Sequence, residues 1–503
     1  MSVLSTVFPT GSPQNEVDFT ASGAVTSGKP VIINTDGTVS DAGLVTGSET
    51  LGGPVDANDV IGKGFGVDIC YDSGNDRLVA VWLRNADAYP MASVGTISGT
   101  TTTWGTPVII ESVAGDAQPV IDYSPDAGKV LAVYTGATPF NPRGVVGTVS
   151  GSTITWGSAT LVNSEDSSQY HRITYDTGNN QFLVCSFGGV SPYNLTVTIG
   201  TITGTSVAFT GSTVFATGGA NDYPVGIAYD ENAAAFAILY RNSAAEQYGT
   251  TGTSDGSTLT LGTTSLIGSW NSGGTGAITY DSTAQKCVAV WKNTSGYGAG
   301  AVITVVGGAT RSFTAATETA FNSLAVGTDQ SMHCTYATTA ADITTVIFVE
   351  TADNYPRFCN GTVSGTSISF NTAARLWTDN GLSSRNNICP IADGKVAIVG
   401  QSNTTIGSLT DNFVAVNVLQ NVANLTNMTA TNLLGVASAA ISDTATGTIN
   451  TMGGINAAQT GLTIGSDYYA QADGTVTTTS ASPAQKLGMA VSATEINLKD
   501  RTA

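Results

Sequence analysis

One motif recurs along this chain at a nearly constant interval, and that repeat limits the folds open to it. The tyrosines of five segments that align without gaps lie 52, 52, 54 and 51 residues apart. The segments are ICYDSGNDRLVAVW from Ile69, IDYSPDAGKVLAVY from Ile121, ITYDTGNNQFLVCS from Ile173, IAYDENAAAFAILY from Ile227 and ITYDSTAQKCVAVW from Ile278. Two degenerate copies begin at Leu324 and Asn387. A period of this length indicates an array of similar units rather than several unrelated domains.

Each unit contains the sequence signals of two hairpins. The first joins two hydrophobic runs through a polar turn such as SGND, SPDAG or TGNN. The second carries a Gly-Thr-x-Ser/Thr-Gly signature, seen at Gly95, Gly147, Gly200 and Gly361. Four strands in about 52 residues is the period of a propeller blade. The sequence therefore predicts an all-β fold with a β-propeller of about seven four-stranded blades. The seventh is short and degenerate, so a strand from elsewhere is one way to close it, and six blades plus a cap is the alternative.

Composition agrees with this fold and excludes several partners. Charged residues are 11% of the chain, well below the usual share of about 25%, and Gly is 59 residues. The formal net charge of −19 argues against nucleic acid, whose binding proteins present a basic surface. It also argues against a polybasic membrane anchor. No apolar run is long enough for membrane insertion, and the N-terminal residues do not resemble a signal peptide.

The two ends of the chain differ from the repeat and resemble each other. SGAVTSGKPVIINTDGTVS stands near the N-terminus and TGLTIGSDYYAQADGTVTTT near the C-terminus. Both read as a strand, an Asp-Gly turn and a second strand. We expect one small β module built from both ends, with residues 1–56 as its first part, the propeller at 57–420 inserted into it, and residues 421–503 as its second part. Two unrelated β appendages are the alternative.

The order of the terminal segments resembles a known family. SGKPVIINTDGTVS is followed, after the repeat, by LLGVASAAISDTATGTINTMGGIN, LTIGSDYYAQADGTVTT and LGMAVSATEINL. This order is similar to a small β module of tail-fibre and other virion structural proteins of tailed bacteriophages, especially marine ones. The resemblance covers about 120 residues at the two ends, in a family where the first two pieces usually lie close together. It implies a virion location, other virion proteins as partners and a homo-oligomer, with a trimer as the expected state.

The residues expected of an enzyme or a metal site are scarce. The two histidines are His171 and His333, and no zinc, calcium or phosphate-binding motif is complete, so we predict no metal and no cofactor. The nearest match to a sialidase hairpin motif, Ser124 to Gly128, lacks its Trp, and a turn accounts for it. Cys70, Cys185, Cys287 and Cys334 lie in apolar runs and are expected to be buried free thiols.

The recurring Tyr-Asp pair has a structural interpretation. It occurs as Tyr71-Asp72, Tyr175-Asp176, Tyr229-Asp230 and Tyr280-Asp281. Because the pair returns in blade after blade, we expect the Asp to cap the turn through its side chain and the Tyr to pack between blades.

A second recurring aromatic position is the candidate binding site. One ring stands 17 to 19 residues after the first-strand tyrosine, in the connection between the second and third strands of six units. The predicted ligand-binding residues are Tyr89, Phe140, Tyr193, Tyr248, Tyr297 and Tyr355. These connections emerge on one face of a propeller, where aromatic rings can stack on sugars or anchor a protein. The alternative is that each ring packs onto its own hairpin.

These observations together predict a non-enzymatic bacteriophage virion protein. We expect a tail fibre or similar appendage whose propeller binds a host-surface ligand, such as a glycan, in host attachment. Two other classes stay open: a capsid decoration or connector protein, and a polysaccharide-degrading propeller enzyme. The enzyme would need a carboxylate pair about 5–10 Å apart in the central channel or a groove.

Overall fold

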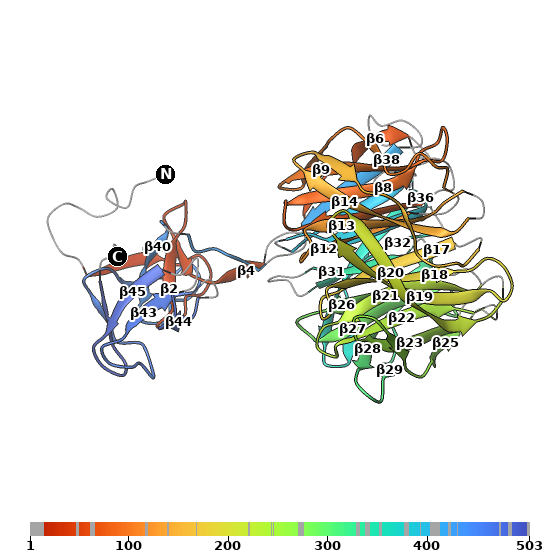
Figure 1. Cartoon of the computed structure of the whole chain (residues 1–503). Coiled ribbons are helices and arrows are strands. Elements are labelled where there is room, and N and C mark those ends of the chain that lie inside the picture. Colours follow the sequence, from red (N-terminus) through yellow and green to blue (C-terminus); the bar gives the residue numbers. More distant parts are fainter. Residues whose placement is uncertain are drawn as a thin grey trace. The chain divides into compact units, whose positions relative to one another are not determined.

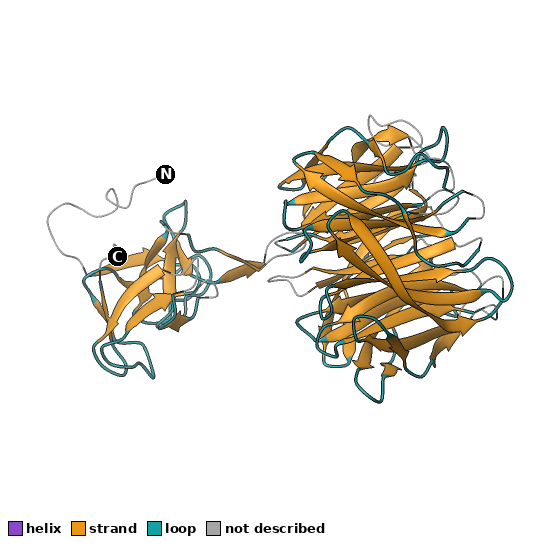
Figure 2. Cartoon of the chain, viewed as in Figure 1, coloured by secondary structure: helices purple, strands orange, loops and turns teal. Residues whose placement is uncertain are grey.

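The computed structural model describes most of the chain as strands and connecting loops, and Figure 2 shows no helix in the described part. None of these residues, accordingly, forms a helix able to cross a membrane. The described residues are 15–46, 50–60, 66–115, 119–137, 140–166, 169–219, 222–242, 244, 246–269, 276–327, 332–337, 343–351, 355–376, 382–392, 394–402, 413–420, 424–429, 431–471, 474–480 and 485–499.

The chain divides into two compact units, one of which is inserted into the other. Residues 48–423 form the larger unit, and residues 1–47 together with 424–503 form the smaller one. The propeller therefore begins before the predicted position 57 and ends just after the predicted position 420. The first boundary differs because residues 50–56 pair with the last strand of the propeller.

The larger unit contains seven antiparallel sheets in sequence order (Figure 1). The first sheet comprises β7 (Val67–Asp72), β8 (Arg77–Leu83), β9 (Pro90–Ser98), β10 (Thr101–Trp104) and β11 (Val108–Ile109). The second comprises β12 (Val120–Ser124), β13 (Lys129–Thr135), β14 (Pro142–Ser150), β15 (Thr153–Trp156) and β16 (Thr160–Leu161). The third comprises β17 (Gln169–Asp176), β18 (Gln181–Phe187), β19 (Asn194–Thr203) and β20 (Ser206–Thr217). The fourth comprises β21 (Tyr223–Asp230), β22 (Ala235–Arg241), β23 (Glu246–Ser254), β24 (Leu259–Leu261) and β25 (Ser265–Ser269). The fifth comprises β26 (Gly276–Asp281), β27 (Lys286–Lys292), β28 (Tyr297–Val306), β29 (Ser312–Ala315) and β30 (Thr319–Ala325). The sixth comprises β31 (His333–Ala337), β32 (Ile343–Val349), β33 (Pro356–Ser364), β34 (Ser367–Phe370) and β35 (Ala374–Arg375). The seventh comprises β36 (Leu382–Pro390), β37 (Lys395–Ser402) and β38 (Phe413–Gln420), and is completed by β5 (Thr50–Leu51) and β6 (Val55–Val60).

The first strand of each sheet lies at the inner edge of a closed ring. β7 contacts β12, and the contacts continue through β17, β21, β26, β31 and β36 back to β7. This is the arrangement of a β-propeller, with each sheet as one blade. The all-β propeller predicted from the repeat is therefore confirmed.

The last blade takes its outermost strands from the start of the unit. Leu51 pairs with Leu419, and Val55 and Asp56 pair with Val416 and Ala415. Figure 1 shows β6 beside β38, although the two are far apart in sequence. Residues 50–56 thus belong to the propeller and not to the module, because their backbone groups complete the seventh sheet.

The Gly-Thr-x-Ser/Thr-Gly signature is explained by the turn between the third and fourth strands. Its second glycine begins a two-residue hairpin loop with positive φ, as at Gly99 (62°) and Gly151 (62°). Loops of this kind favour glycine because L side chains are strained there. Its first glycine lies beneath an aromatic ring of the fourth strand: a Cβ on Gly95 would lie 2.9 Å from the Trp104 ring.

The Tyr-Asp pair has the two structural roles predicted for it. Asp72 accepts hydrogen bonds from the backbone N–H groups of Gly74 and Asn75 and so caps the turn. The tyrosine hydroxyl reaches the turn of the preceding blade: Tyr175 donates to Asp126 at 2.7 Å, and Tyr336 donates to Thr283 at 2.7 Å. The tyrosines thus connect neighbouring blades on the side where the first strand turns into the second.

Replacing Tyr175 with Phe removes one of these links without altering the ring packing. We expect the free energy of unfolding to fall by about 1–2 kcal/mol, because the variant removes a hydrogen bond to a carboxylate oxygen of the neighbouring blade. Tyr71→Phe is the matched control, since the Tyr71 hydroxyl donates to Asp76 of its own exposed turn and should matter less. Denaturant unfolding measures both. Equal effects for the two variants would contradict a role between blades.

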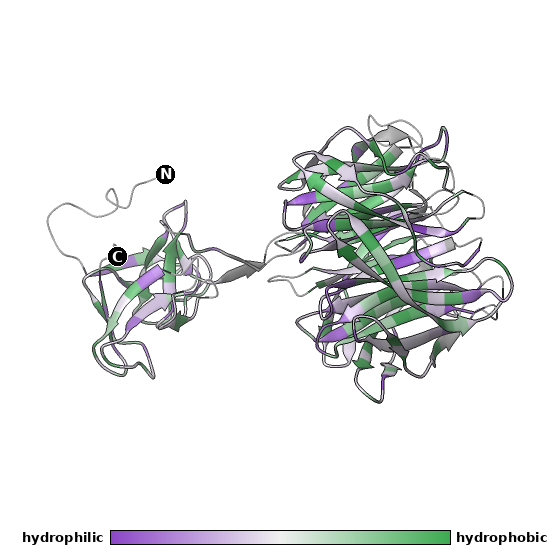
Figure 3. Cartoon of the chain, in the orientation of Figure 1, coloured by the Kyte–Doolittle hydropathy of each residue, from purple (hydrophilic) through white to green (hydrophobic). Residues whose placement is uncertain are grey.

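The blades are held together by apolar side chains that fill the spaces between sheets. Figure 3 shows hydrophobic residues along the propeller strands. The largest fully buried side chains include Trp82, Tyr134, Phe182, Phe236 and Trp291. All six cysteines are buried free thiols, as expected for the four that lie in apolar runs.

The smaller unit joins strands from both ends of the chain, as predicted. The strand order of its first sheet is β1 (Glu16–Thr20), β41 (Thr446–Asn450), β40 (Leu433–Ala437), β2 (Pro30–Ile33) and β3 (Val39–Asp41). Its second orders β42 (Ile455–Asn456), β46 (Ile496–Leu498), β45 (Gln485–Ala490), β43 (Asp467–Ala470) and β44 (Val476–Thr477). β4 (Leu44–Thr46) pairs with β39 (Asn424–Thr426). Because the C-terminal strands β41 and β40 lie between the N-terminal strands β1 and β2, neither end can complete the first sheet alone.

Candidate functional site

The six predicted ligand-binding residues lie at the ends of the blades where the second strand leads into the third. Tyr248 and Tyr297 fall within β23 and β28, and the other four precede the third strand of their blades. Tyr297 is the most exposed, at 37%, and the other five are half-buried. In a meander these connections lie at the opposite end from the first turn of each blade. The rings therefore share the face that is remote from the Tyr-Asp turns.

Four of these rings contact side chains of their own blade. The Arg84 guanidinium lies 5.7 Å from the Tyr89 ring centre, and that of Arg375 lies 4.0 Å from the Tyr355 ring centre. Tyr248 stacks on Tyr240 at 5.6 Å. These contacts hold the hairpins, as the alternative interpretation required, yet they leave part of each ring exposed. Binding of a ligand by the six rings stays a prediction.

The fourth contact, of Tyr193, belongs to a row of rings that crosses from the third blade to the fourth. Tyr193 stacks on Phe187 at 6.3 Å, and Phe187 lies 6.2 Å from Tyr170. Tyr170 in turn stacks on Tyr223 of the next blade at 4.5 Å. The row ends at Arg241, whose guanidinium donates to the Tyr223 hydroxyl at 2.9 Å. Tyr170 and Tyr193 are half-buried, so the row has an exposed border.

Sequence reasoning did not single out Tyr170, Tyr223 or Arg241. Their contacts cross from one blade to another, whereas the sequence pattern compares equivalent positions within each blade. A usable signal was nevertheless present, because Tyr170 and Tyr223 stand five and six residues before the recurring tyrosines Tyr175 and Tyr229.

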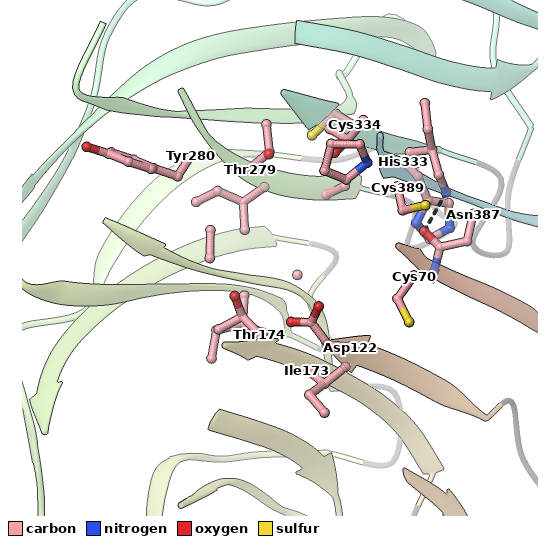
Figure 4. Close-up of a pocket in the computed structure, with 18 of the residues that line it drawn as sticks. Cys70, Asp122, Ile173, Thr174, Thr279, Tyr280, His333, Cys334, Asn387 and Cys389 are labelled. Carbon is pink, nitrogen blue, oxygen red and sulfur yellow. Dashed lines mark hydrogen bonds between the residues drawn. The ribbon is translucent and has the colours of Figure 1, made fainter. Parts of the chain in front are cut away.

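The central channel is a second candidate site. It has a volume of about 580 Å³ and is lined by the first strands of all seven blades. Figure 4 shows Asp122 and Thr174 extending from neighbouring strands into the same space. One ring of the lining consists of the residues directly before the recurring tyrosine, or before Pro390 in the last blade: Cys70, Asp122, Thr174, Ala228, Thr279, Thr335 and Cys389.

Two carboxyl groups line the channel and connect adjacent inner strands. Asp68 on β7 accepts from the backbone N–H of Ile69 at 2.7 Å and from that of Ile121 on β12 at 2.8 Å. Asp122 on β12 accepts from the N–H of Tyr123 at 2.8 Å. Burial raises the pKa of each carboxyl to about 7, although the hydrogen bonds from backbone amides act in the opposite direction.

The basic groups near the channel are also engaged with the backbone. Arg172 donates through Nε to the carbonyl of Val225 and through Nη1 to that of His171, at 2.9 and 2.7 Å. His171 is fully buried between Thr135 and Ser186, and burial lowers its pKa to about 3. His333 lines the channel and is 5% exposed. The Ser124–Gly128 segment is a turn whose Asp126 accepts from Tyr175, which agrees with its structural interpretation.

Comparison with known proteins identifies the fold. No protein-family model matches the sequence, and no curated protein matches it. Among solved structures, the chain is similar to BP39L lectin from Burkholderia pseudomallei, with 11% identity, a TM-score of 0.55, and 72% of this chain and 97% of that chain covered.

Two further similarities have TM-scores below 0.5. A lectin of Aleuria aurantia, described as a six-bladed β-propeller with a fucose recognition mode, has 12% identity and a TM-score of 0.40, covering 63% of this chain and 96% of that one. The intramolecular trans-sialidase of Ruminococcus gnavus has 12% identity and a TM-score of 0.42, covering 74% and 98%. Identities this low establish a likeness of fold only, and the assignment of a β-propeller rests on the closed ring of sheets in the larger unit.

Proposed function

We propose that this chain is a non-enzymatic virion protein of a tailed bacteriophage whose propeller binds a glycan of the host surface. The observation that carries the binding role is the recurrence of a partly exposed aromatic ring at one position in six blades, all on one face. Aromatic rings stack on the apolar faces of sugars, and several weak sites on one head act together. The virion location rests on the resemblance of the terminal segments to phage tail-fibre proteins.

The same resemblance supports a tail fibre or appendage built as a homo-oligomer, with a trimer as the expected state. A non-enzymatic role is supported by the channel carboxylates, since both oxygens of Asp68 accept hydrogen bonds from backbone amides. A capsid decoration or connector protein is the alternative. Electron cryomicroscopy of the particle separates the two, because attachment requires the aromatic face to point outward and a connector requires it to be covered.

The binding role is tested by an array of bacterial surface polysaccharides probed with the full chain. We expect selective binding, and we expect replacement of Tyr89, Tyr297 and Tyr355 by Ser to weaken it at least tenfold, since the variant removes three stacking platforms. Tyr175→Phe, on the opposite face, is the control and should bind normally.

Two results would overturn the proposal. A folded protein that binds none of the polysaccharides contradicts the glycan-binding role. Shortening of a bound polysaccharide, followed by mass spectrometry, contradicts the non-enzymatic role.

A further inference from the structure

Three threonines in the central channel have hydroxyl groups without a hydrogen-bond partner among the described residues. Thr174, Thr279 and Thr335 come from the third, fifth and sixth blades and occupy equivalent positions in the lining. None of their side chains forms a hydrogen bond with another described residue. Thr335 is only 5% exposed. Thr174 and Thr279 are half-buried, so these hydroxyls are open to the channel, where water or a bound molecule can supply their hydrogen-bond partners.

The charged groups of the channel restrict what that occupant can be. The lining contains three carboxyl groups, those of Asp68, Asp122 and Glu231, and two basic side chains, those of Arg172 and His333. Arg172 uses Nε and Nη1 for backbone carbonyls, and its Nη2 makes no hydrogen bond with a described residue. With a chain charge of −19, the channel does not favour an anion. The available groups are therefore hydroxyls, the Nη2 of Arg172, the Nδ2 of Asn387 and carboxyl oxygens, which suit a neutral molecule with many hydroxyls.

The size and walls of the channel fit a small organic molecule. Its volume of about 580 Å³ lies within the usual range for such sites. The lining continues past the inner strands to Ser73, Glu231 and Ser282 in the first turns of their blades. At that end it includes the rings of five recurring tyrosines: Tyr71, Tyr175, Tyr229, Tyr280 and Tyr336. These rings provide apolar surface next to the polar groups. A sugar suits such a site because it has polar hydroxyls at its edge and an apolar ring face.

We propose that the central channel binds a neutral polyhydroxylated molecule of mono- or disaccharide size. The hydroxyls of Thr174, Thr279 and Thr335 and the Nη2 group of Arg172 bond its hydroxyls, and the tyrosine-lined end receives its apolar face. This site is distinct from the aromatic rings of the proposed host-binding face, because it lies in the channel and extends toward the opposite turns. It goes beyond the proposed function and does not depend on it.

Saturation-transfer NMR with the full chain tests the site. The probes are a set of common monosaccharides, disaccharides and sugar alcohols, each added alone. We expect at least one to bind saturably. We expect Thr279→Val and Thr335→Val each to weaken that binding about fivefold, since each removes one hydroxyl and retains shape and β-branching. Ala228→Leu, which places a larger side chain in the lining, should abolish it.

Controls separate this site from the host-binding face. The triple Ser variant of Tyr89, Tyr297 and Tyr355 should bind the small probes normally while losing polysaccharide binding. Thermal unfolding confirms that each variant is folded, and the Val variants keep the test valid if Ala228→Leu does not fold. The proposal is overturned if no probe binds, or if binding is unchanged in both folded Val variants. Loss of polysaccharide binding with retained probe binding would contradict the host-binding role alone.

Discussion

A segment spanning residues 57–420 is expected to lose the cooperative unfolding that a segment spanning 48–423 retains. The shorter segment lacks β5 and the start of β6, which pair with β38 at Leu419, Val416 and Ala415. Without them the outer edge of the seventh blade is open, and an open edge invites association with other chains. The lost strand pairing should lower the free energy of unfolding by about 3–5 kcal/mol.

Denaturant unfolding and size-exclusion chromatography of the two segments measure this effect. A segment spanning 53–423 is the graded control, since it lacks β5 but keeps β6, and it should fall between the other two. Identical unfolding curves for 57–420 and 48–423 would show that ring closure does not depend on the N-terminal strands.

Stability should decrease as the pH rises from about 4 to 7, opposite to the behaviour of most acidic proteins. Burial raises the folded-state pKa of Asp68 to about 7, whereas an unfolded Asp titrates near 3.9. The folded state thus holds a proton that the unfolded state has released. Between these two values the free energy of unfolding falls by about 1.4 kcal/mol per pH unit for this group. Above pH 7 the stabilisation that came from the proton bound in the folded state is lost.

Asp122 acts in the same direction, because burial raises its pKa to about 7 as well. His171 acts in the opposite direction between about pH 3 and 6.5, because burial lowers its pKa to about 3, so it offsets one of the two carboxyl contributions there. Hydrogen bonds lower the pKa of the exposed Asp36, and its titration falls below this window. Unfolding by denaturant at intervals from pH 4 to pH 8 measures the slope, and Asp68→Asn should flatten it by removing one titrating group. A wild-type stability that rises from pH 5 to pH 7 would refute the assignment.

The repeat was sufficient to predict the blades because propeller strands are local. Each hairpin joins segments adjacent in sequence, so turn signals and alternating apolar runs report it directly. The roles of Tyr175 and Asp72 followed from their recurrence, since a residue that returns in most blades serves the architecture. The split module was expected from the resemblance of the terminal segments to a phage virion module, together with the strand-turn-strand pattern at both ends.

The origin of the seventh blade's outer strands was not predictable in this way. Thr50–Leu51 and Val55–Val60 carry no repeat signature, and only their pairing with residues 413–420 identifies them as part of the propeller. The channel threonines escaped notice for a related reason. Their position carries four residue types across seven blades, while the next position is tyrosine in six. A search for repeats detects residues that are the same in successive blades, whereas a ligand-binding site uses residues that differ from blade to blade.

The dependence of the last blade on the first strands sets an order of events during synthesis. β6 leaves the ribosome about 350 residues before β38, a delay of roughly 20–70 seconds at ordinary rates of translation. For that period β5 and β6 lack β38 and β1 lacks β41, while β2 can pair with β3 but not yet with β40. The first blades can form as they emerge, but the ring and then the module must close after them. This chain therefore folds at its two ends last, and co-translational chaperones would meet its N-terminal strands in their unpaired state.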